Sequence, residues 1–542
     1  MTAPDEPVGE PAPTDRRLRV IAGTAEDGEK VLALLDDSTI RVDLSSGTVP
    51  WRQQILALAL VDLLGRLFPR LDIRSDAETP SHPDLPPGPE RFQDRLAEAA
   101  RNGGLPELGP TAPVITIRVG TTPPHEAPGE GVSLHVDGGG WVSYNGTQPS
   151  QLPDGPWAAV SIGPLAAACR AAGQTASLIL GSQPTTESIP PAVYVSALTY
   201  SSSDAPLPDE AAATGAAPLL HAVLVGAGSI GGATAYALAH TPGLAGTLVV
   251  ADPQRLEEKN LDRALLATAT VAAAEPFKAD VVKAALAHHG ALEVTAWPKR
   301  LEEWVASRPR TEVLPLVLTA VDSRDARRLI QDCLPLDLVN AACNPTEIHL
   351  SGHRTGQGPC VCCLHMEEVL DAKAVRSRLL QAATGLNERM VLHYLAGDLP
   401  MPAMLVRGIE RHRGLAPNCL SQYEGRTLEE LRVGHLLYGA TPVQTSTGTV
   451  AVAAPYVTAL AGTLLAGEAL KVATPGLDTF RLGPPGPHIK YAENPLAGAN
   501  RAVLTNPPRW PGSECLCRST RRLRIMRQRY GLAPEPADDQ NP

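Results

Sequence analysis

The chain has 542 residues, a formal net charge of −11 at pH 7 and 9 cysteines, and this length predicts two or three domains rather than one hydrophobic core. The acidic balance and the lack of a long basic run argue against nucleic acid as a partner. No stretch of about 18 uninterrupted apolar residues is present, and the acidic, proline-rich amino terminus does not resemble a signal peptide. We therefore expect a soluble, cytoplasmic protein with no membrane partner. An odd number of cysteines, mostly in two short runs, favours metal ligation or free thiols over a secreted disulfide framework.

The first part of the chain predicts an α/β domain. Residues 1–15 are predicted to be disordered, and residues 16–200 to form the domain. A buried helix is expected over Trp51–Phe68, and residues 157–173 are interpreted as a strand that leads into a helix. Short strands are expected at residues 40–44, 114–119, 132–136 and 141–144. The region has no glycine fingerprint, so we expect it to pack against the rest of the protein rather than bind a nucleotide.

A glycine-rich turn follows a predicted linker at residues 201–217. An apolar strand leads into Gly226-x-Gly228-x-x-Gly231 and then into an alanine-rich helix. This order places free backbone N–H groups and the positive end of a helix dipole where a phosphate can bind. Asp252 follows the next predicted strand, at the position where an acid holds a ribose hydroxyl. The segment therefore predicts a nucleotide site.

Polar residues follow this turn at intervals. Asn260, Arg263 and Lys278 are separated by apolar stretches, a helix is predicted to begin near Phe277, and a later apolar strand leads to Asp322. Because the carboxyl ends of parallel strands converge on one crevice, these residues are expected to face the pocket that holds Asp252. This set suits a nucleoside triphosphate with magnesium better than a dinucleotide. The alternatives are a solvated helix face for the two cations and a helix N-cap for the second acid.

These elements, taken in order, resemble those of the ThiF/MoeB-type, ubiquitin-activating-enzyme-like adenylating enzymes. The resemblance spans about residues 218–517 and implies a Rossmann-like adenylation domain with a mainly parallel sheet. It implies that the glycine turn and Asp252 bind ATP, and that Asn260, Arg263 and Lys278 contact the triphosphate. It associates Asp322 with magnesium and with the acyl-adenylate. In such chemistry the protein positions the reactants and neutralises phosphate charge, and no general base is required.

The clustered cysteines predict a structural zinc site. Cys360 and Cys363 have C-x-x-C spacing, and Cys515 and Cys517 lie near the carboxyl terminus. Four thiolates in two short segments can close a tetrahedral zinc site, and the resemblance implies that such a site ties the carboxyl-terminal segment to the rest of the domain. The second pair departs from the usual spacing, so Cys362 could replace one ligand, or the thiols could be unligated. His365 is expected at the surface or beside the site rather than on the metal.

Enzymes of the resembling family borrow an arginine from a partner subunit or from a degenerate second copy of the domain. No arginine lies between Arg170 and Arg255, so the segment before the glycine turn cannot supply one. The helix that begins PWRQQ resembles the Arg-Gln element that opens such domains, which makes Arg52 the candidate. Residues 16–200 would then be an inactive pseudo-adenylation half, although a homodimer is also possible. A solvent-facing arginine in the first turn of the helix is the alternative.

Transfer of the activated substrate to a thiol is also considered. Alignment on Pro455 places Thr447 where related enzymes carry a cysteine, but a crossover insert at about residues 366–445 contains Cys419. Nearby Arg413 and Arg426 could raise its thiolate fraction. An ordinary thiol is the alternative. A basic helix and tail are expected over residues 518–542.

Together these features predict an ATP-dependent enzyme that adenylates a carboxyl terminus, with Mg²⁺ and Zn²⁺ as cofactors. The favoured substrate is a small ubiquitin-like or sulfur-carrier protein. A precursor peptide of natural-product biosynthesis is the alternative within the same chemistry. An NAD-dependent oxidoreductase would also use the glycine turn and Asp252, but it leaves Lys278, Asp322 and the paired cysteines without a role. A non-enzymatic adaptor that keeps the fold as a scaffold is the remaining possibility.

Overall fold

The computed structural model describes most of the chain. The described residues are 28–44, 49–103, 107–108, 114–120, 131–153, 157–180, 189–211, 216–309, 312–344, 347–365, 380–381, 384–396, 399–413, 420–431, 444–445, 448–449, 453–495, 502–509 and 515–532. They divide into two compact units. The larger contains residues 35–366 and 455–542, and the smaller contains residues 1–34 and 367–454.

Within the described residues, the larger unit holds two eight-stranded sheets, one in each half of the unit. The first sheet has the order β3-β2-β1-β4-β5-β6-β7-β8. Its strands are β1 (Thr39–Asp43), β2 (Arg70–Arg74), β3 (Glu107–Leu108), β4 (Ile115–Val119), β5 (Val132–Gly139), β6 (Val142–Gly146), β7 (Val193–Ser196) and β8 (Ser202–Ser203). The second has the order β11-β10-β9-β12-β13-β14-β17-β18. Its strands are β9 (Leu219–Val225), β10 (Ala245–Ala251), β11 (Leu292–Trp297), β12 (Leu316–Thr319), β13 (Asp337–Cys343), β14 (Ile348–Arg354), β17 (Lys490–Glu493) and β18 (Val503–Thr505).

The two sheets have the same topology. In each, the first strand along the chain lies between the second and the fourth, and the first five strands run parallel. Each of the last three strands of each sheet pairs antiparallel with the strand before it in the sheet order. The expected α/β class with mainly parallel sheets is therefore confirmed, and the amino-terminal and carboxyl-terminal halves of the larger unit repeat one strand arrangement.

Two local predictions in the amino-terminal half were wrong. Residues 157–161 do not form a strand, because the Val160 N–H donates to the Ala158 carbonyl in a turn and the Ala158 N–H donates to the Asp209 side chain. These donors are unavailable to a sheet. Conversely, the predicted linker begins with edge strand β8, which pairs with β7 through Ser202 and Ser203.

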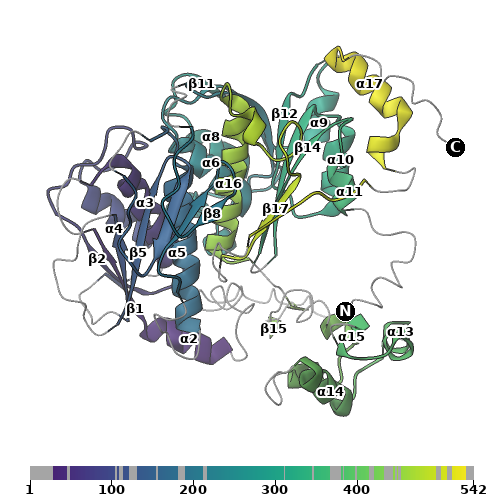
Figure 1. Ribbon diagram of the computed structural model, residues 1–542, viewed down its shortest axis with the longest axis horizontal. Helices are drawn as coiled ribbons and strands as arrows, with labels where there is room; N and C mark the ends of the chain where they lie inside the picture. Colours follow the sequence, from purple (N-terminus) through teal and green to yellow (C-terminus); the bar gives the residue numbers. More distant parts are fainter. Residues whose placement is uncertain are drawn as a thin grey trace, which may run out of the picture. The chain divides into compact units, whose positions relative to one another are not determined.

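Four apolar helices connect the two halves. They are α3 (Trp51–Gly65), α5 (Ile162–Leu180), α6 (Ser229–Ala239) and α16 (Pro455–Ala473). Helix α5 packs on β5, β6 and α3, whereas α16 packs on β9, β13, β14 and α6, and α5 and α16 contact each other. Figure 1 shows α16 next to α5 and α6 near the middle of the larger unit. Their all-round apolar composition is explained by this position, because both faces of the layer meet a sheet or another helix.

Buried polar contacts reinforce this layer. The Arg170 guanidinium of α5 donates to Glu493 of β17 at 2.7 and 2.8 Å. The Tyr200 hydroxyl donates to Glu468 of α16 at 2.7 Å. Helix α16 is long and apolar enough to cross a membrane, but 94% of its most apolar window is buried inside the larger unit. Its apolar composition is therefore explained by its place in the core.

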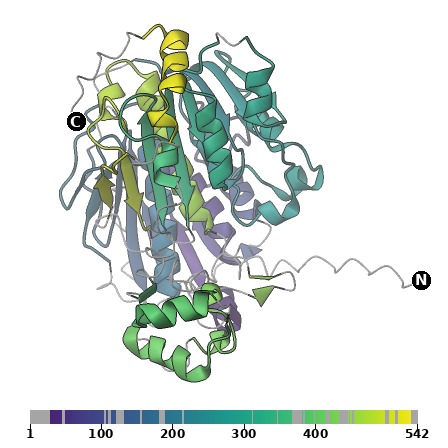
Figure 2. The same ribbon diagram turned by 90° about the vertical axis from the view of Figure 1, so that its right-hand side faces the viewer.

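The remaining helices of the larger unit flank the sheets. They are α4 (Phe92–Arg101), α7 (Ala269–Ala273), α8 (Lys278–Ala285), α9 (Leu301–Ala306), α10 (Arg324–Asp332), α11 (Val361–His365) and α17 (Thr520–Tyr530). The basic helix α17 docks on the carboxyl-terminal half (Figure 2): Met526 is buried, the Arg529 side chain donates to the Cys333 carbonyl, and the Tyr530 hydroxyl contacts Leu314 and Leu334. Its positive charges thus belong to a packed element.

The smaller unit contains short helices with a core of their own. These include α13 (Glu388–Ala396), α14 (Ala403–Arg413) and α15 (Leu428–Leu431), and a two-stranded ribbon pairs β15 (Gln444–Thr445) with β16 (Gly448–Thr449). Buried apolar residues on these helices, such as Val391, Val406 and Leu428, form one cluster. Helix α2 (Gly28–Asp37) contains residues assigned to both units. Cys419 and Thr447 lie outside the described residues.

Candidate functional site

The turn between β9 and α6 is built around glycines. Gly226 has φ +89°, and a Cβ added there would lie 2.7 Å from the Ala320 carbonyl oxygen. A Cβ added at Gly231 would lie 1.9 Å from the Gly226 carbonyl oxygen, whereas one at Gly228 would meet nothing within 4 Å. Gly228 is the N-cap of α6, and its missing side chain leaves the first helical turn open to a ligand. The turn therefore has the tight backbone and the helix N-terminus that suit an anionic phosphate.

Asp252 connects this turn to the end of β10. One carboxylate oxygen accepts a hydrogen bond from the Ala227 N–H at 2.6 Å, and the other accepts one from the Gln254 N–H at 2.7 Å. The side chain is buried, with 5% of the residue exposed. The carboxylate thus holds the glycine turn in place, and each oxygen keeps a second lone pair for a ligand donor.

Lys278 lies beside this carboxylate at the start of α8. Its ammonium group donates to the Gln254 side-chain oxygen at 2.8 Å, and its backbone N–H donates to the Gln254 carbonyl. Burial lowers the pKa of Lys278, the charge of Asp252 opposes that shift, and the charge of Arg263 adds to it. Lys278 was predicted from the sequence and Gln254 was not, because nothing about a glutamine after Asp-Pro signals a bridging role.

Asn260 ends the short 3₁₀ helix Glu258–Asn260, and Arg263 lies on the turn that follows it. The Asn260 side-chain oxygen accepts a hydrogen bond from the Glu257 N–H at 3.0 Å, and this residue is buried. The Arg263 guanidinium pairs with Asp262 at 3.1 Å, and its carbonyl accepts a hydrogen bond from the Thr458 hydroxyl of α16. A solvated helix face, the alternative for Arg263 and Lys278, is wrong for both: Arg263 is outside any helix and Lys278 is only 8% exposed.

Asp322 lies on the exposed loop between β12 and α10. The N-cap of α10 is Ser323, whose hydroxyl accepts a hydrogen bond from the Ala326 N–H at 3.0 Å, so the N-cap alternative for Asp322 is wrong. Buried Arg327 supports the loop, because its guanidinium contacts the Val321 carbonyl and donates to the Asn340 side chain at 2.9 Å. Neither supporting residue was identified from sequence, since both lie inside ordinary helix and strand patterns.

Strand order brings these loops to one edge of the sheet. β9 pairs in parallel with β10 on one side and with β12 on the other. The glycine turn, Asp252 and Asp322 therefore follow the carboxyl ends of three adjacent parallel strands. In an open α/β sheet this edge forms the ligand crevice.

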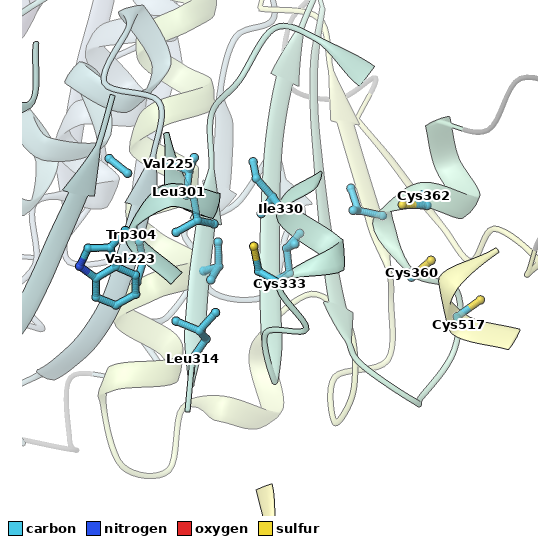
Figure 3. Packing of buried hydrophobic residues seen from close by; sticks show 14 of the residues in the cluster. Val223, Val225, Leu301, Trp304, Leu314, Ile330, Cys333, Cys360, Cys362 and Cys517 are labelled. Carbon is cyan, nitrogen blue, oxygen red and sulfur yellow. The ribbon is translucent and has the colours of Figure 1, made fainter. Parts of the chain in front are cut away.

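Four cysteine thiols converge in the carboxyl-terminal half. The sulfur atoms of Cys360, Cys363, Cys515 and Cys517 all lie within 4.8 Å of one another, with contacts of 3.3 to 3.8 Å. Zn–S bonds of about 2.3 Å in a tetrahedron separate sulfur atoms by roughly 3.8 Å, so the four thiols fit zinc closely. Cys362 is buried but is not part of this group. Figure 3 shows Cys360 and Cys517 near each other at one side of the hydrophobic cluster that also contains Ile330 and Cys333.

Arg52 lies at the start of α3 in the amino-terminal half. Its guanidinium donates to the Asp137 carboxylate at 2.7 Å and to the Gly138 carbonyl at 3.1 Å. The residue is 8% exposed, so the solvent-facing alternative is wrong. Burial raises the pKa of Asp137, and the charge of Arg52 opposes that shift. Its role as the borrowed arginine stays a prediction.

Besides Cys362 and the four clustered thiols, the described residues include Cys169, Cys333 and Cys343. The apolar runs around Cys169, Cys333 and Cys343 predict buried thiols. Cys169 and Cys333 are buried, whereas Cys343 at the end of β13 is only partly buried. The His365 side chain lies outside the described residues, although its backbone ends α11.

Comparison with known proteins adds independent information. The chain is 27% identical over 321 residues to the uncharacterized protein y4jF of Sinorhizobium fredii, and the match covers 58% of this chain and 59% of that protein. Solved structures of E. coli MccB are also similar. MccB with ATP is 14% identical, with a TM-score of 0.31, and the match covers 54% of this chain and 64% of that chain. MccB with SeMet MccA is 14% identical, with a TM-score of 0.32, and covers 55% and 67%. The chain thus spans about three fifths of its curated relative and about two thirds of MccB.

A family model gives the assignment. The model described as the ThiF family matches residues 218–492, which is more than half of the chain and includes the glycine turn, Asp252, Lys278 and Asp322. The protein therefore belongs to the ThiF family.

Proposed function

We propose that this protein is an ATP-dependent adenylyltransferase that activates a carboxylate. In the reaction a carboxylate oxygen attacks the α-phosphorus of ATP. The bond from that phosphorus to its bridging oxygen breaks, pyrophosphate leaves, and an acyl-adenylate forms. The observation that carries the proposal is the direct linkage of the glycine turn to Asp252 and, through Gln254, to Lys278.

Each charged residue has a role in this reaction. The glycine turn and the N-terminus of α6 receive phosphate oxygens. Asn260, Arg263 and Lys278 contact the triphosphate, and the two cations neutralise the charge that accumulates on the leaving pyrophosphate. Asp322, exposed at the same edge of the sheet, binds Mg²⁺, whose preferred ligands are oxygens. A nicotinamide cofactor gives Lys278 and Asp322 no comparable role.

The carboxylate belongs to the carboxyl terminus of a small ubiquitin-like or sulfur-carrier protein, and a precursor peptide is the alternative substrate. In a second step, the activated carboxylate is transferred to the thiol of Cys419, which lies in the insert at about residues 366–445, and AMP leaves. The four thiols hold Zn²⁺ as a structural ion, with no part in the reaction. The amino-terminal half acts as an inactive pseudo-adenylation copy, which the shared strand order supports, and Arg52 is its candidate contribution to the nucleotide site.

Two measurements test the proposal. Calorimetric titration of the purified full chain with Mg·ATP and, separately, with NAD should give binding for Mg·ATP only. ATP–pyrophosphate exchange is then measured with a panel of ubiquitin-like proteins that end in Gly-Gly and with short peptides. Exchange that depends on one class of carboxyl terminus identifies the substrate. A preference for NAD, or no ATP binding, would contradict the proposal.

A further inference from the structure

Arg66 crosses from the amino-terminal half to the segment that follows Asn260. It is the C-cap of α3, and its side chain is completely buried. One terminal nitrogen donates to the Leu261 carbonyl, and the other donates to the carbonyls of Leu265 and Ala267, at 3.4 and 3.2 Å. A single guanidinium of one half thus binds three backbone oxygens of the other.

The segment needs such a partner because it is irregular. Residues 261–267 form turns rather than a helix or strand. Its internal backbone hydrogen bonds use the carbonyls of Glu258, Asn260 and Ala264, which are different from the three that Arg66 binds. A buried carbonyl without a donor is costly. The planar, multi-donor guanidinium serves three such oxygens at once, which a lysine ammonium on a flexible stem cannot do in the same geometry.

Arg66 is itself held in place by its own half. Its Nε donates to Asp62 one helical turn earlier, at 2.6 Å, and the second oxygen of Asp62 accepts a hydrogen bond from the Asn102 amide at 2.7 Å. Gly103 leaves the space for this arrangement, since a Cβ there would lie 2.8 Å from the Arg66 side chain. The guanidinium is therefore oriented before it meets the segment.

The segment carries part of the candidate nucleotide site. It directly follows Asn260 and includes Arg263. The Arg263 carbonyl accepts a hydrogen bond from the Thr458 hydroxyl of α16 at 3.4 Å. The backbone that carries Arg263 is thus anchored by α16 within its own half and by Arg66 from the other half.

We propose that Arg66 is a positioning residue through which the amino-terminal half holds the 261–267 segment, so that Asn260 and Arg263 are preorganised for the triphosphate. The inference rests on the proposed function for its effect on ATP. The anchoring itself does not depend on that function. It gives the amino-terminal half a task in the nucleotide site that requires no contact with the nucleotide.

Two readouts on the full chain test the proposal. Amide hydrogen exchange without ligand reports the anchoring, and calorimetric titration with Mg·ATP reports its consequence. In Arg66→Met, which keeps an unbranched apolar stem but removes the guanidinium and its donors, exchange within 261–267 should accelerate about tenfold or more. The Kd for Mg·ATP should rise about tenfold. Arg66→Lys, which restores one charged donor, should lie between Arg66→Met and the wild type in both measurements.

Matched variants separate positioning from general loosening of the interface. Tyr200→Phe removes one hydrogen bond between the halves, to Glu468, and should leave both readouts at wild-type values. Asn102→Ala keeps Arg66 but removes the hydrogen bond that the Asn102 amide donates to Asp62. It should shift both readouts in the same direction as Arg66→Met, by a smaller factor. This variant tests the proposal if Arg66→Met does not fold.

Wild-type exchange of residues 261–267 in Arg66→Lys and Asn102→Ala would overturn the anchoring. Accelerated exchange with unchanged Mg·ATP affinity would overturn its role in the nucleotide site. A wild-type chain that binds no Mg·ATP would instead contradict the proposed function, while the exchange data would still decide the anchoring.

Discussion

The two halves of the larger unit share a strand order and differ at the turn after their first strand. In the carboxyl-terminal half, only residues 226–228 separate β9 from α6, and the tight turn depends on Gly226 and Gly231. In the amino-terminal half, β1 ends at Asp43 and α3 begins at Trp51 after Pro50, so the connection is longer and lacks that pattern. The two halves share one topology, but only the carboxyl-terminal half has the glycines that allow the close backbone contacts of a tight phosphate-binding turn.

The start of the first helix shows the same contrast. The N-terminus of α6 begins at a glycine that leaves open space, whereas α3 begins with Arg52 paired to buried Asp137. The opposite charges of Arg52 and Asp137 neutralise each other in this buried pair. This comparison favours the carboxyl-terminal half as the one that binds a nucleotide.

The largest effect is expected from the four clustered thiols of the carboxyl-terminal half. Cys517→Ser removes one of four ligands, so zinc measured by mass spectrometry should fall from about one equivalent per chain to below half. The thermal midpoint should fall with it, because metal binding contributes to folding. Cys362→Ser is the matched control, since this residue is outside the group of four, and it should retain zinc. A wild-type chain without zinc would show that the four thiols are unligated.

The ion pair of the amino-terminal half should control stability. Arg52→Ala leaves Asp137 buried without its cation and should destabilise the protein by about 3–5 kcal/mol in denaturant unfolding. The double variant Arg52→Ala/Asp137→Asn should recover much of this loss, because the unpaired charge is gone. The double variant also tests the borrowed arginine: unaltered ATP–pyrophosphate exchange would remove Arg52 from the catalytic set.

The glycine turn should control nucleotide affinity alone. Gly231→Ala places a Cβ 1.9 Å from the Gly226 carbonyl oxygen, so the turn must open and the affinity for Mg·ATP should fall about 100-fold, or about 2.7 kcal/mol. Gly232→Ala in the same helix meets nothing within 4 Å and should bind Mg·ATP like the wild type. Equal affinities of the two variants would indicate that the phosphates bind elsewhere.

A smaller effect is expected from Lys278. Lys278→Met removes a cation from the site and should weaken Mg·ATP binding about 10- to 100-fold in titration calorimetry. Lys283→Met, on the exposed face of the same helix, is the control and should have little effect. Loss of affinity in both variants would indicate a general charge effect rather than a contact with ATP.

The pH dependence follows from the lysine. Burial lowers the pKa of Lys278, so the group loses its charge at a lower pH than an exposed lysine does. Affinity for Mg·ATP should therefore decline earlier on the alkaline side. Lys278→Arg, which stays charged, should move that decline to higher pH.

Much of the candidate site was predictable because its signals are local. The glycine spacing, the acid after the second strand and the paired cysteines are short patterns with a direct physical meaning, and the structure places these residues at one sheet edge and in one thiol cluster. The nearly all-round apolar composition of residues 51–68 also predicted the buried helix α3, and the start of α8 near Phe277 was predicted correctly.

Only the tertiary structure decided how distant residues combine. Examples are the three carbonyls that Arg66 binds, the bridge of Gln254 between Asp252 and Lys278, and the pairing of Arg52 with Asp137. These contacts join residues up to about 200 positions apart. The repeated strand order became visible only in the hydrogen-bonded sheets. The physical reason is that a local pattern specifies the backbone it occupies, whereas the partner of a buried polar group depends on which other segment packing brings within hydrogen-bond distance.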